Sequence, residues 1–200
     1  MQADLELLAA WASGDAGAGR EFYGRYAQRI ARFFARKLPD EAADRVQRTF
    51  LKCLEVVKAG REVGDPGALL FAIARNELHD ALRARMRDRD RFDPDEVTLE
   101  QLGTAPPDRL ARRQEQATLL RALRQLPIDD QLALELYYWE DMPMERIGQV
   151  LGISRTAAVS RVHRARQLLR DLIGRLQAAP DVIADTLGGF ETWARSLRED

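Results

Sequence analysis

Cysteine and histidine are scarce in this 200-residue chain, which contains one cysteine, Cys53, and two histidines. A single cysteine excludes an intramolecular disulfide framework, and the apolar neighbours of Cys53 at helical spacing are typical of a small core residue. His79 and His163 lie far from Cys53 and from each other in the sequence, so no metal-ligand cluster or catalytic triad is indicated. We therefore expect no metal, no cofactor and no enzymatic activity.

The chain also lacks a phosphate-binding loop and a membrane span. The glycines at 13–17 are not followed by Lys-Ser or Lys-Thr, which a phosphate loop requires. No apolar run reaches membrane-spanning length, and no signal peptide is recognisable. These absences predict a soluble, cytoplasmic protein without a membrane partner.

Strand-like alternation is rare, whereas apolar residues recur at helical spacing through most of the chain, which predicts an all-α protein. A further amphipathic helix is possible at 181–198. We expect Asp40 to cap the helix that follows it. The predicted helices span residues 3–12, 18–38, 41–59, 66–89, 109–125, 129–139, 144–151 and about 155–175.

The net charge of −1 says nothing about nucleic acid, but the distribution of charge does. Arginines are concentrated near 75–91 and 146–175. In contrast, residues 92–110 hold three prolines, one glycine and five acidic residues, a composition typical of a flexible linker. The sequence therefore predicts two small helical domains joined by an acidic flexible linker. The predicted segments are a first domain at 1–91, the linker at 92–110, a second domain at 111–176 and a C-terminal extension at 177–200.

The stretch from Pro143 to Arg170 has the pattern of a helix-turn-helix. Gly152 fits the left-handed turn, and Ser154 is a good N-cap for the second helix. That helix has one apolar stripe and an opposite, arginine-rich surface, as a helix in a DNA major groove would have. An ordinary helical hairpin with a solvated basic face is the alternative.

Five motifs, taken in order, resemble the extracytoplasmic-function type of RNA polymerase sigma factor, a minimal member of the sigma-70 family. Two resemble region 2 and three resemble region 4. They are D-R-V-Q-R-T-F-L at 44–51, I-A-R-N-E-L-H-D-A-L-R at 73–83, L-P-I-D-D-Q-L-A-L-E-L-Y-Y-W-E at 126–140, I-G-Q-V-L-G-I at 147–153 and S-R-V-H-R-A-R at 160–166.

The resemblance implies an alternative sigma factor that binds core RNA polymerase and directs promoter-specific transcription initiation. Region 4 would read the minus-35 element through Ser154, Arg155, Thr156, Ser160, Arg161 and Arg164. Region 2 would melt the minus-10 element through Arg75, Asn76, Asp80 and Arg83, with loop 61–67 as a pocket for an extruded base. The linker would thread the polymerase cleft.

The resemblance also implies contacts with the beta-prime clamp helices and the beta flap of the polymerase. The clamp-binding positions would be Asp40, Glu41, Asp44, Gln47 and Arg48. An anti-sigma factor is a possible further partner.

Thr49 follows the basic sequence R-V-Q-R, a context that many Ser/Thr kinases accept. The window from Asp40 to Leu51 has a net charge of only −1, so its electrostatic attraction to a basic clamp surface is expected to be weak. We therefore hypothesise that a kinase phosphorylates Thr49, that Arg45 pairs with the phosphate, and that polymerase binding is switched on. The alternative is that Thr49 packs beside Phe50.

Two other functions remain as alternatives. An autonomous helix-turn-helix regulator would explain the basic helix at about 155–175. Such a regulator, however, has no need for the motif at 73–83. An enzyme is disfavoured because His79, His163 and Cys53 offer no site.

Overall fold

The computed structural model describes residues 2–86, 92–102 and 114–176, which form two compact units that divide between Ala84 and Arg85. The described residues contain α-helices, one short 3-10 helix and a single isolated β-bridge, so the predicted all-α class is confirmed. None of the helices in these residues combines the length and the apolar character of a membrane-spanning segment.

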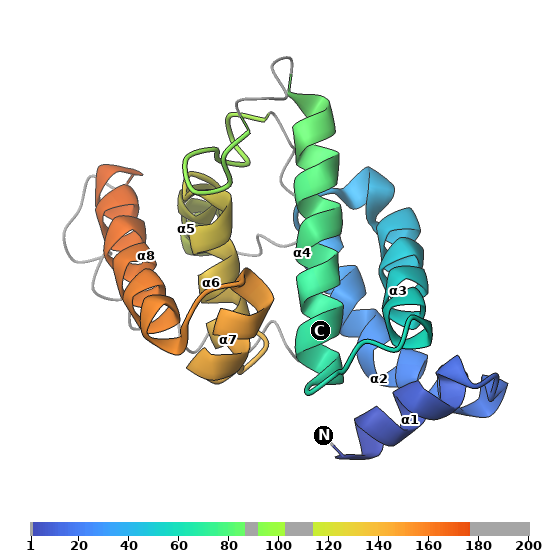
Figure 1. Cartoon of the computed structure of the whole chain (residues 1–200). Helices are drawn as coiled ribbons and strands as arrows, with labels where there is room; N and C mark the ends of the chain where they lie inside the picture. Colours follow the sequence, from blue (N-terminus) through green and yellow to red (C-terminus); the bar gives the residue numbers. More distant parts are fainter. Residues whose placement is uncertain (1, 87–91, 103–113, 177–200) are drawn as a thin grey trace. The chain divides into compact units, whose positions relative to one another are not determined.

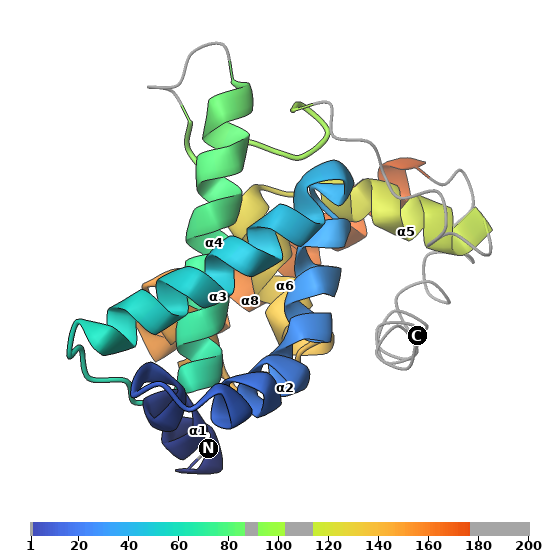
Figure 2. The ribbon, with the colours of Figure 1, turned by 90° about the vertical axis from the view of Figure 1, so that its right-hand side faces the viewer.

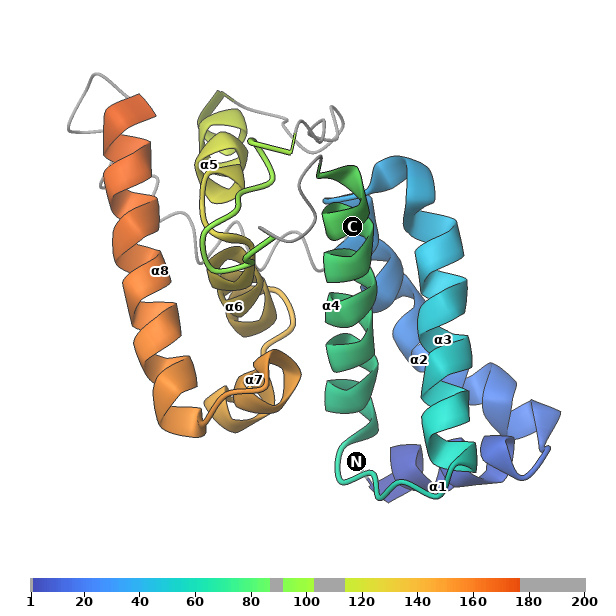
Figure 3. The ribbon, with the colours of Figure 1, turned by 45° about the horizontal axis from the view of Figure 1, so that its top comes forward.

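The first unit holds four helices, which Figure 1 shows in blue to green. Their bounds are α1 (Gln2–Ala12), α2 (Ala16–Ala35), α3 (Ala42–Lys58) and α4 (Pro66–Arg85), with the 3-10 helix η1 (Pro39–Glu41) before α3. Helices α3 and α4 lie side by side and run in opposite directions (Figure 3). The helix α1 lies across one end of α2 (Figure 2).

Aspartates at two helix starts explain where α2 and α4 begin. Asp15 accepts hydrogen bonds from the backbone N–H groups of Gly17 and Ala18, and Asp65 accepts one from Ala68. The predicted cap at Asp40 is wrong, because Asp40 lies inside η1 and the position before α3 has no side-chain cap. Proline at the start of η1 favours this tight turn.

Aromatic rings form the core that fixes the first unit. Phe22 of α2 meets Phe50 of α3 edge to face at 6.3 Å between ring centroids, and Phe33 of α2 meets Phe71 of α4 in the same way at 6.0 Å. Cys53 is fully buried in this core, as predicted, and burial raises the pKa of its thiol to about 12. It is therefore a packing residue.

The second unit is built around its long last helix. The bounds are α5 (Gln114–Arg124), α6 (Ile128–Tyr138), α7 (Met144–Leu151) and α8 (Arg155–Leu176). Helices α5, α6 and α7 all pack against α8 (Figure 1). The predicted helix at 181–198 lies outside the described residues.

The turn between α7 and α8 has the predicted chemistry. Gly152 has a φ of 69°, in the left-handed region, and Ser154 Oγ accepts a hydrogen bond of 3.1 Å from the backbone N–H of Ala157. A Cβ on Gly148 would lie 2.7 Å from the Ile153 carbonyl oxygen, so only glycine lets the chain pass this close. The helix-turn-helix is therefore present in the structure.

Residues 92–102, predicted to belong to a flexible linker, are instead bound to the second unit. The backbone N–H of Ile128 donates to the Val97 carbonyl at 3.0 Å, and that of Asp129 donates to the Pro94 carbonyl at 3.1 Å. Leu99 is fully buried. Composition indicated a linker, but an apolar anchor and free backbone groups at the start of α6 hold this part in place.

Candidate nucleic-acid and protein interfaces

The exposed face of α8 begins at its N-terminus. The buried stripe is made of Ala158, Val162, Ala165, Leu169 and Ile173. Of the predicted DNA-reading residues, Ser154, Arg155, Thr156 and Ser160 are all exposed. Backbone N–H groups without helical partners and the positive end of the helix dipole lie at the same place, so this end suits contact with nucleic-acid phosphates.

Arg161 and Arg164 are placed differently from those four residues, because both are held by carboxylates. Arg164 donates to both oxygens of Asp130, at 2.7 and 3.2 Å, and its side chain stays 55% exposed. Arg161 donates to both oxygens of Asp95 and is only 14% exposed. The hydrogen bonds that Arg161 donates to Asp95 raise the pKa of Arg161. Arg161 therefore lies on the flank of α8, beside its buried stripe.

Two outward-facing residues of α8, Val159 and Gln167, were not predicted from the sequence, whereas His163 was expected on this basic face. Val159 and His163 are exposed, and Gln167 lies 3.1 Å from the His163 Nε2 atom. Helical periodicity could have found them, because they lie opposite the Ala158–Val162 stripe. The predicted DNA-reading residues were instead chosen by residue type, which favoured arginine and serine.

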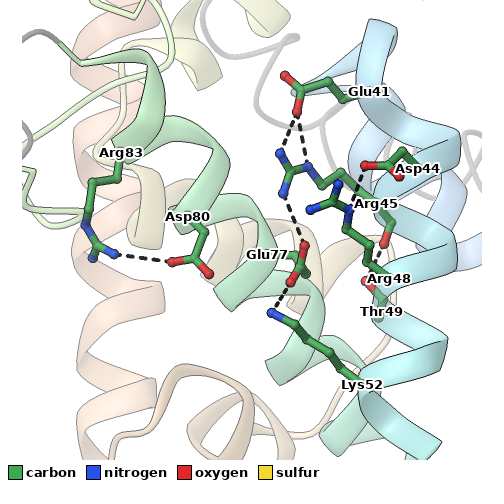
Figure 4. Close-up of polar contacts among 9 residues, drawn as sticks. All are labelled: Glu41, Asp44, Arg45, Arg48, Thr49, Lys52, Glu77, Asp80 and Arg83. Carbon is green, nitrogen blue, oxygen red and sulfur yellow. Dashed lines mark hydrogen bonds and ion pairs between the residues drawn. The ribbon is translucent and has the colours of Figure 1, made fainter.

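The predicted minus-10 residues fall mostly on one face of α4. Asn76, Asp80 and Arg83 are exposed at spacings of four and three residues, and Arg83 pairs with Asp80 at 3.3 Å (Figure 4). Arg75 is half-buried beside them. In loop 61–67, Asp65 serves as the N-cap of α4, so its carboxylate is already engaged.

Glu77, on the other side of α4, was not singled out from the sequence, yet it ties α4 to α3. Its carboxylate is 3% exposed and pairs with Arg45 at 3.1 Å and with Lys52 (Figure 4). Burial alone would raise the pKa of Glu77, but these two hydrogen bonds outweigh burial and lower it. The sequence indicates the burial of Glu77 only through its spacing, because Glu77 lies midway between Ile73 and Ala81, which are both buried on α4.

The exposed face of α3 carries most of the predicted polymerase-binding residues. Asp44, Gln47 and Arg48 are exposed, and Asp44 pairs with Arg48 at 2.8 Å (Figure 4). Asp40 is exposed on η1, whereas Glu41 is half-buried and accepts two hydrogen bonds from Arg45, at 2.7 and 3.1 Å.

Two large apolar side chains that the sequence analysis did not single out are exposed, one on α3 and one on α2. Leu51 is 50% exposed, and the exposed ring of Tyr23 from α2 lies 4.7 Å from the ring of Phe50. Large exposed apolar side chains beside charged ones are a common feature of protein-binding surfaces.

The structure does not support Thr49 as a kinase site. Its side chain is fully buried, and its hydroxyl donates to the Arg45 carbonyl at 2.7 Å (Figure 4). Arg45, the expected partner of a phosphate, pairs with Glu41 and Glu77 instead. Thr49 is therefore a packing residue, as the alternative interpretation states. It lies next to the core residue Phe50 on the inner side of α3.

Known families match both units. The family described as Sigma-70 region 2 matches residues 22–88, and the family described as Sigma-70, region 4 matches residues 116–169. The sigma factor CarQ of Myxococcus xanthus is 36% identical over 172 residues, which cover 82% of this chain and 94% of CarQ. The chain is an extracytoplasmic-function sigma factor of the sigma-70 family.

A second relative of this sigma factor is the ECF sigma factor SigE of Mycolicibacterium smegmatis, 29% identical over 158 residues. That match covers 78% of this chain and 61% of SigE. Members of the family direct RNA polymerase to promoters and are not enzymes, so the enzyme alternative is excluded for this sigma factor. Its α8 is the second helix of the region 4 helix-turn-helix.

Proposed function

We propose that this sigma factor reads the minus-35 element through the N-terminal half of α8. The observation that carries this assignment is the group of exposed residues at the start of that helix, Arg155, Thr156 and Ser160. Arginine and serine near a helix N-terminus reach base edges and phosphates in a major groove. Arg164 extends this surface, whereas Arg161 contributes from the flank.

In the same proposal, the exposed face of α4 contacts the minus-10 element. Asn76 offers an amide that can donate and accept, and Arg83 offers a cation for a phosphate. Arg75 lies at the edge of this face. Residues 61–65 of the predicted loop precede α4 and residues 66–67 form its first turn, and this segment is the proposed site for an extruded base.

The face of α3 is proposed to bind the beta-prime clamp helices of core polymerase. Asp44, Gln47 and Arg48 supply polar groups, while Leu51 and Tyr23 supply an apolar anchor that the charged positions alone lack. Asp40 and Glu41 lie at the start of this surface. Net charge is therefore not the only source of affinity, and no phosphate on Thr49 is needed.

We place the beta flap contact on the second unit, at a small hollow between the α5–α6 turn and the C-terminal part of α8. Pro127, Leu168 and Leu172 provide its apolar lining, and Leu168 is partly exposed. An anti-sigma factor could compete for this surface or for α3. Such a factor, like the cytoplasmic location, is part of the proposal.

The test is run-off transcription with purified core polymerase on the DNA upstream of the chain's own gene. A discrete transcript that requires this protein is expected. Arg155→Ala should lower its yield, with promoter affinity reduced by about 1–3 kcal/mol if a base contact is lost. Arg121→Ala, an exposed arginine on α5, is the matched control and should have no effect.

The competing function, an autonomous regulator, predicts a different result. Such a protein would bind its DNA without polymerase and would not be retained by immobilised core enzyme. The exposed, composite face of α3 favours the sigma factor, because a repressor needs no such surface. Failure to bind core polymerase would overturn the proposal.

A further inference from the structure

Residues 92–102, here called the acidic strap, bind the DNA-reading unit through both backbone and apolar contacts. Besides the hydrogen bonds to Ile128 and Asp129, the backbone N–H of Glu100 donates to the Arg124 carbonyl at 3.2 Å. Thr98 and Pro127 form an isolated β-bridge, and Leu99 is fully buried. The strap is therefore joined to the end of α5 and the start of α6.

The strap brings only negative charge to this unit. It contains four acidic residues and no lysine or arginine. Its Asp95 forms a two-pronged ion pair with Arg161 of α8, and one of its two hydrogen bonds, from Nη2 to Oδ2, measures 3.1 Å. The second-unit carboxylates Asp129 and Asp130 lie 3.9 and 3.7 Å from the same guanidinium. Three carboxylates therefore surround one arginine.

Arg164 provides the internal comparison. It is held by Asp130, which is fixed within α6 and 1% exposed, and it still presents 55% of its side chain to solvent. Arg161 is held mainly by Asp95, which belongs to a strap outside the helical core, and it presents only 14%. Arg161 is therefore paired with a carboxylate of the strap, whereas Arg164 is paired with a carboxylate within the helices.

We propose that the acidic strap is an internal ligand of α8 that competes with DNA phosphates for Arg161. The proposal rests on the assignment of α8 as the DNA-reading helix. When the strap is bound, Asp95 occupies the flank of α8, and the free protein binds DNA weakly. When the strap leaves, Arg161 gains exposure and becomes available to the phosphate backbone.

The physical basis is that a carboxylate and a phosphate are both anions that accept a forked pair of hydrogen bonds from arginine. Asp95 occupies the edge of the Arg161 guanidinium formed by Nη1 and Nη2, so a phosphate that binds this edge must displace it. Each arginine that gains a phosphate contact releases about 0.9 of a counterion from duplex DNA, which steepens the salt dependence of binding. Release of the strap should therefore change both the affinity and its salt dependence.

The experiment compares Asp95→Asn with Glu96→Gln in the full chain. Both variants remove one negative charge from neighbouring strap positions with exposed side chains, but only Asp95 pairs with Arg161. The probe is a fluorescent duplex of random sequence, since a phosphate contact does not depend on base sequence. Binding is followed by anisotropy over a series of salt concentrations.

Asp95→Asn should bind the duplex about three- to tenfold more tightly than the parent chain, with a salt slope steeper by up to about one unit. Glu96→Gln should stay within about twofold of the parent. Asp95→Glu, which keeps the charge, should restore weak binding. Adding Arg161→Ala to Asp95→Asn should remove the gain, because the freed cation is then absent.

Two outcomes overturn the proposal. If Asp95→Asn binds no more tightly than Glu96→Gln, the strap does not compete through this pair. If it binds more weakly than the parent chain, Asp95 positions Arg161 for DNA. Run-off transcription with the parent chain tests the proposed function separately. If the parent chain directs a discrete transcript, either of the two outcomes above refutes the strap proposal alone.

Discussion

At the scale of single residues, buried carboxylates decide how the functional faces are held. Glu77 connects α4 to α3, and Asp130 connects α6 to α8. Each one is almost fully buried and accepts hydrogen bonds from arginine on a helix that carries an exposed functional face. Because a buried carboxylate without partners is costly, such pairs fix the helices in register.

Replacing Glu77 tests the first of these contacts. Glu77→Gln should lower the free energy of unfolding at pH 7 by about 1–3 kcal/mol, since a charged hydrogen-bond acceptor is lost. The lowered pKa of Glu77 means that its stabilisation is complete above the ordinary glutamate value of 4.5 and is lost as the pH falls through the folded-state pKa. Urea unfolding should therefore show a smaller acid loss in Glu77→Gln than in the parent.

Asp130 is expected to act through Arg164. Asp130 orients Arg164 and leaves most of its side chain exposed, so Asp130→Asn, which keeps the shape but weakens this hold, should lower promoter affinity about three- to tenfold. In an Arg164→Ala background the same change should have no further effect on affinity. Anisotropy titrations of all four proteins measure this coupling. An equal loss in both backgrounds would mean that Asp130 does not act through Arg164.

Thr49 should not respond to a phosphate mimic with activation. Thr49→Glu introduces a charge at a fully buried position, so the unfolding free energy should fall by about 2 kcal/mol or more, whereas Thr49→Ser should change it by less than about 1 kcal/mol. Thermal unfolding and binding to immobilised core polymerase are the measurements. Tight polymerase binding by a well-folded Thr49→Glu, but not by the parent, would restore the phosphorylation hypothesis.

At the scale of elements, α3 has an inner and an outer face with different duties. Its inner face packs Phe50 and Thr49, while its outer face presents Leu51 beside charged side chains. From the sequence, the affinity of residues 40–51 for the polymerase was judged by their net charge alone. The exposed leucine shows that apolar contact contributes to the proposed polymerase surface, because burying it would add to affinity without any change in charge.

Leu51→Ser should weaken binding to core polymerase about tenfold and leave the melting temperature nearly unchanged, since half of the side chain is already exposed. Val159→Ser is the matched control. Val159 is similarly exposed but lies on α8, so its replacement should leave core binding unaffected. Pull-down on immobilised core enzyme distinguishes the two. Unimpaired binding by Leu51→Ser would exclude Leu51 from the interface.

At the scale of the whole molecule, the division into two units matches the two family regions, and the strap belongs with the second. The C-terminal extension, for which an amphipathic helix is predicted at 181–198, lies outside the described residues. We expect a chain truncated after Gln177 to melt at a lower temperature and to show altered run-off transcription. Unchanged melting and unchanged transcription would leave the extension without a role.

The sequence by itself determined the helices, the helix-turn-helix and the family. These features depend on local rules: Gly152 suits a left-handed turn, Ser154 caps a helix, and apolar residues repeat every three to four positions. The exposed N-terminus of α8 could be predicted for the same reason. Local rules act over a few residues, so one sequence is enough to apply them.

Only the tertiary structure decided which predicted residues are available. Arg161 meets Asp95, which lies 66 positions away, and Glu77 meets Arg45, which lies 32 positions away. Thr49 is buried because it lies on the face of α3 that is turned toward α2 and α4. Such pairings depend on how separate helix faces meet, and helical spacing within one segment carries no information about the partner face.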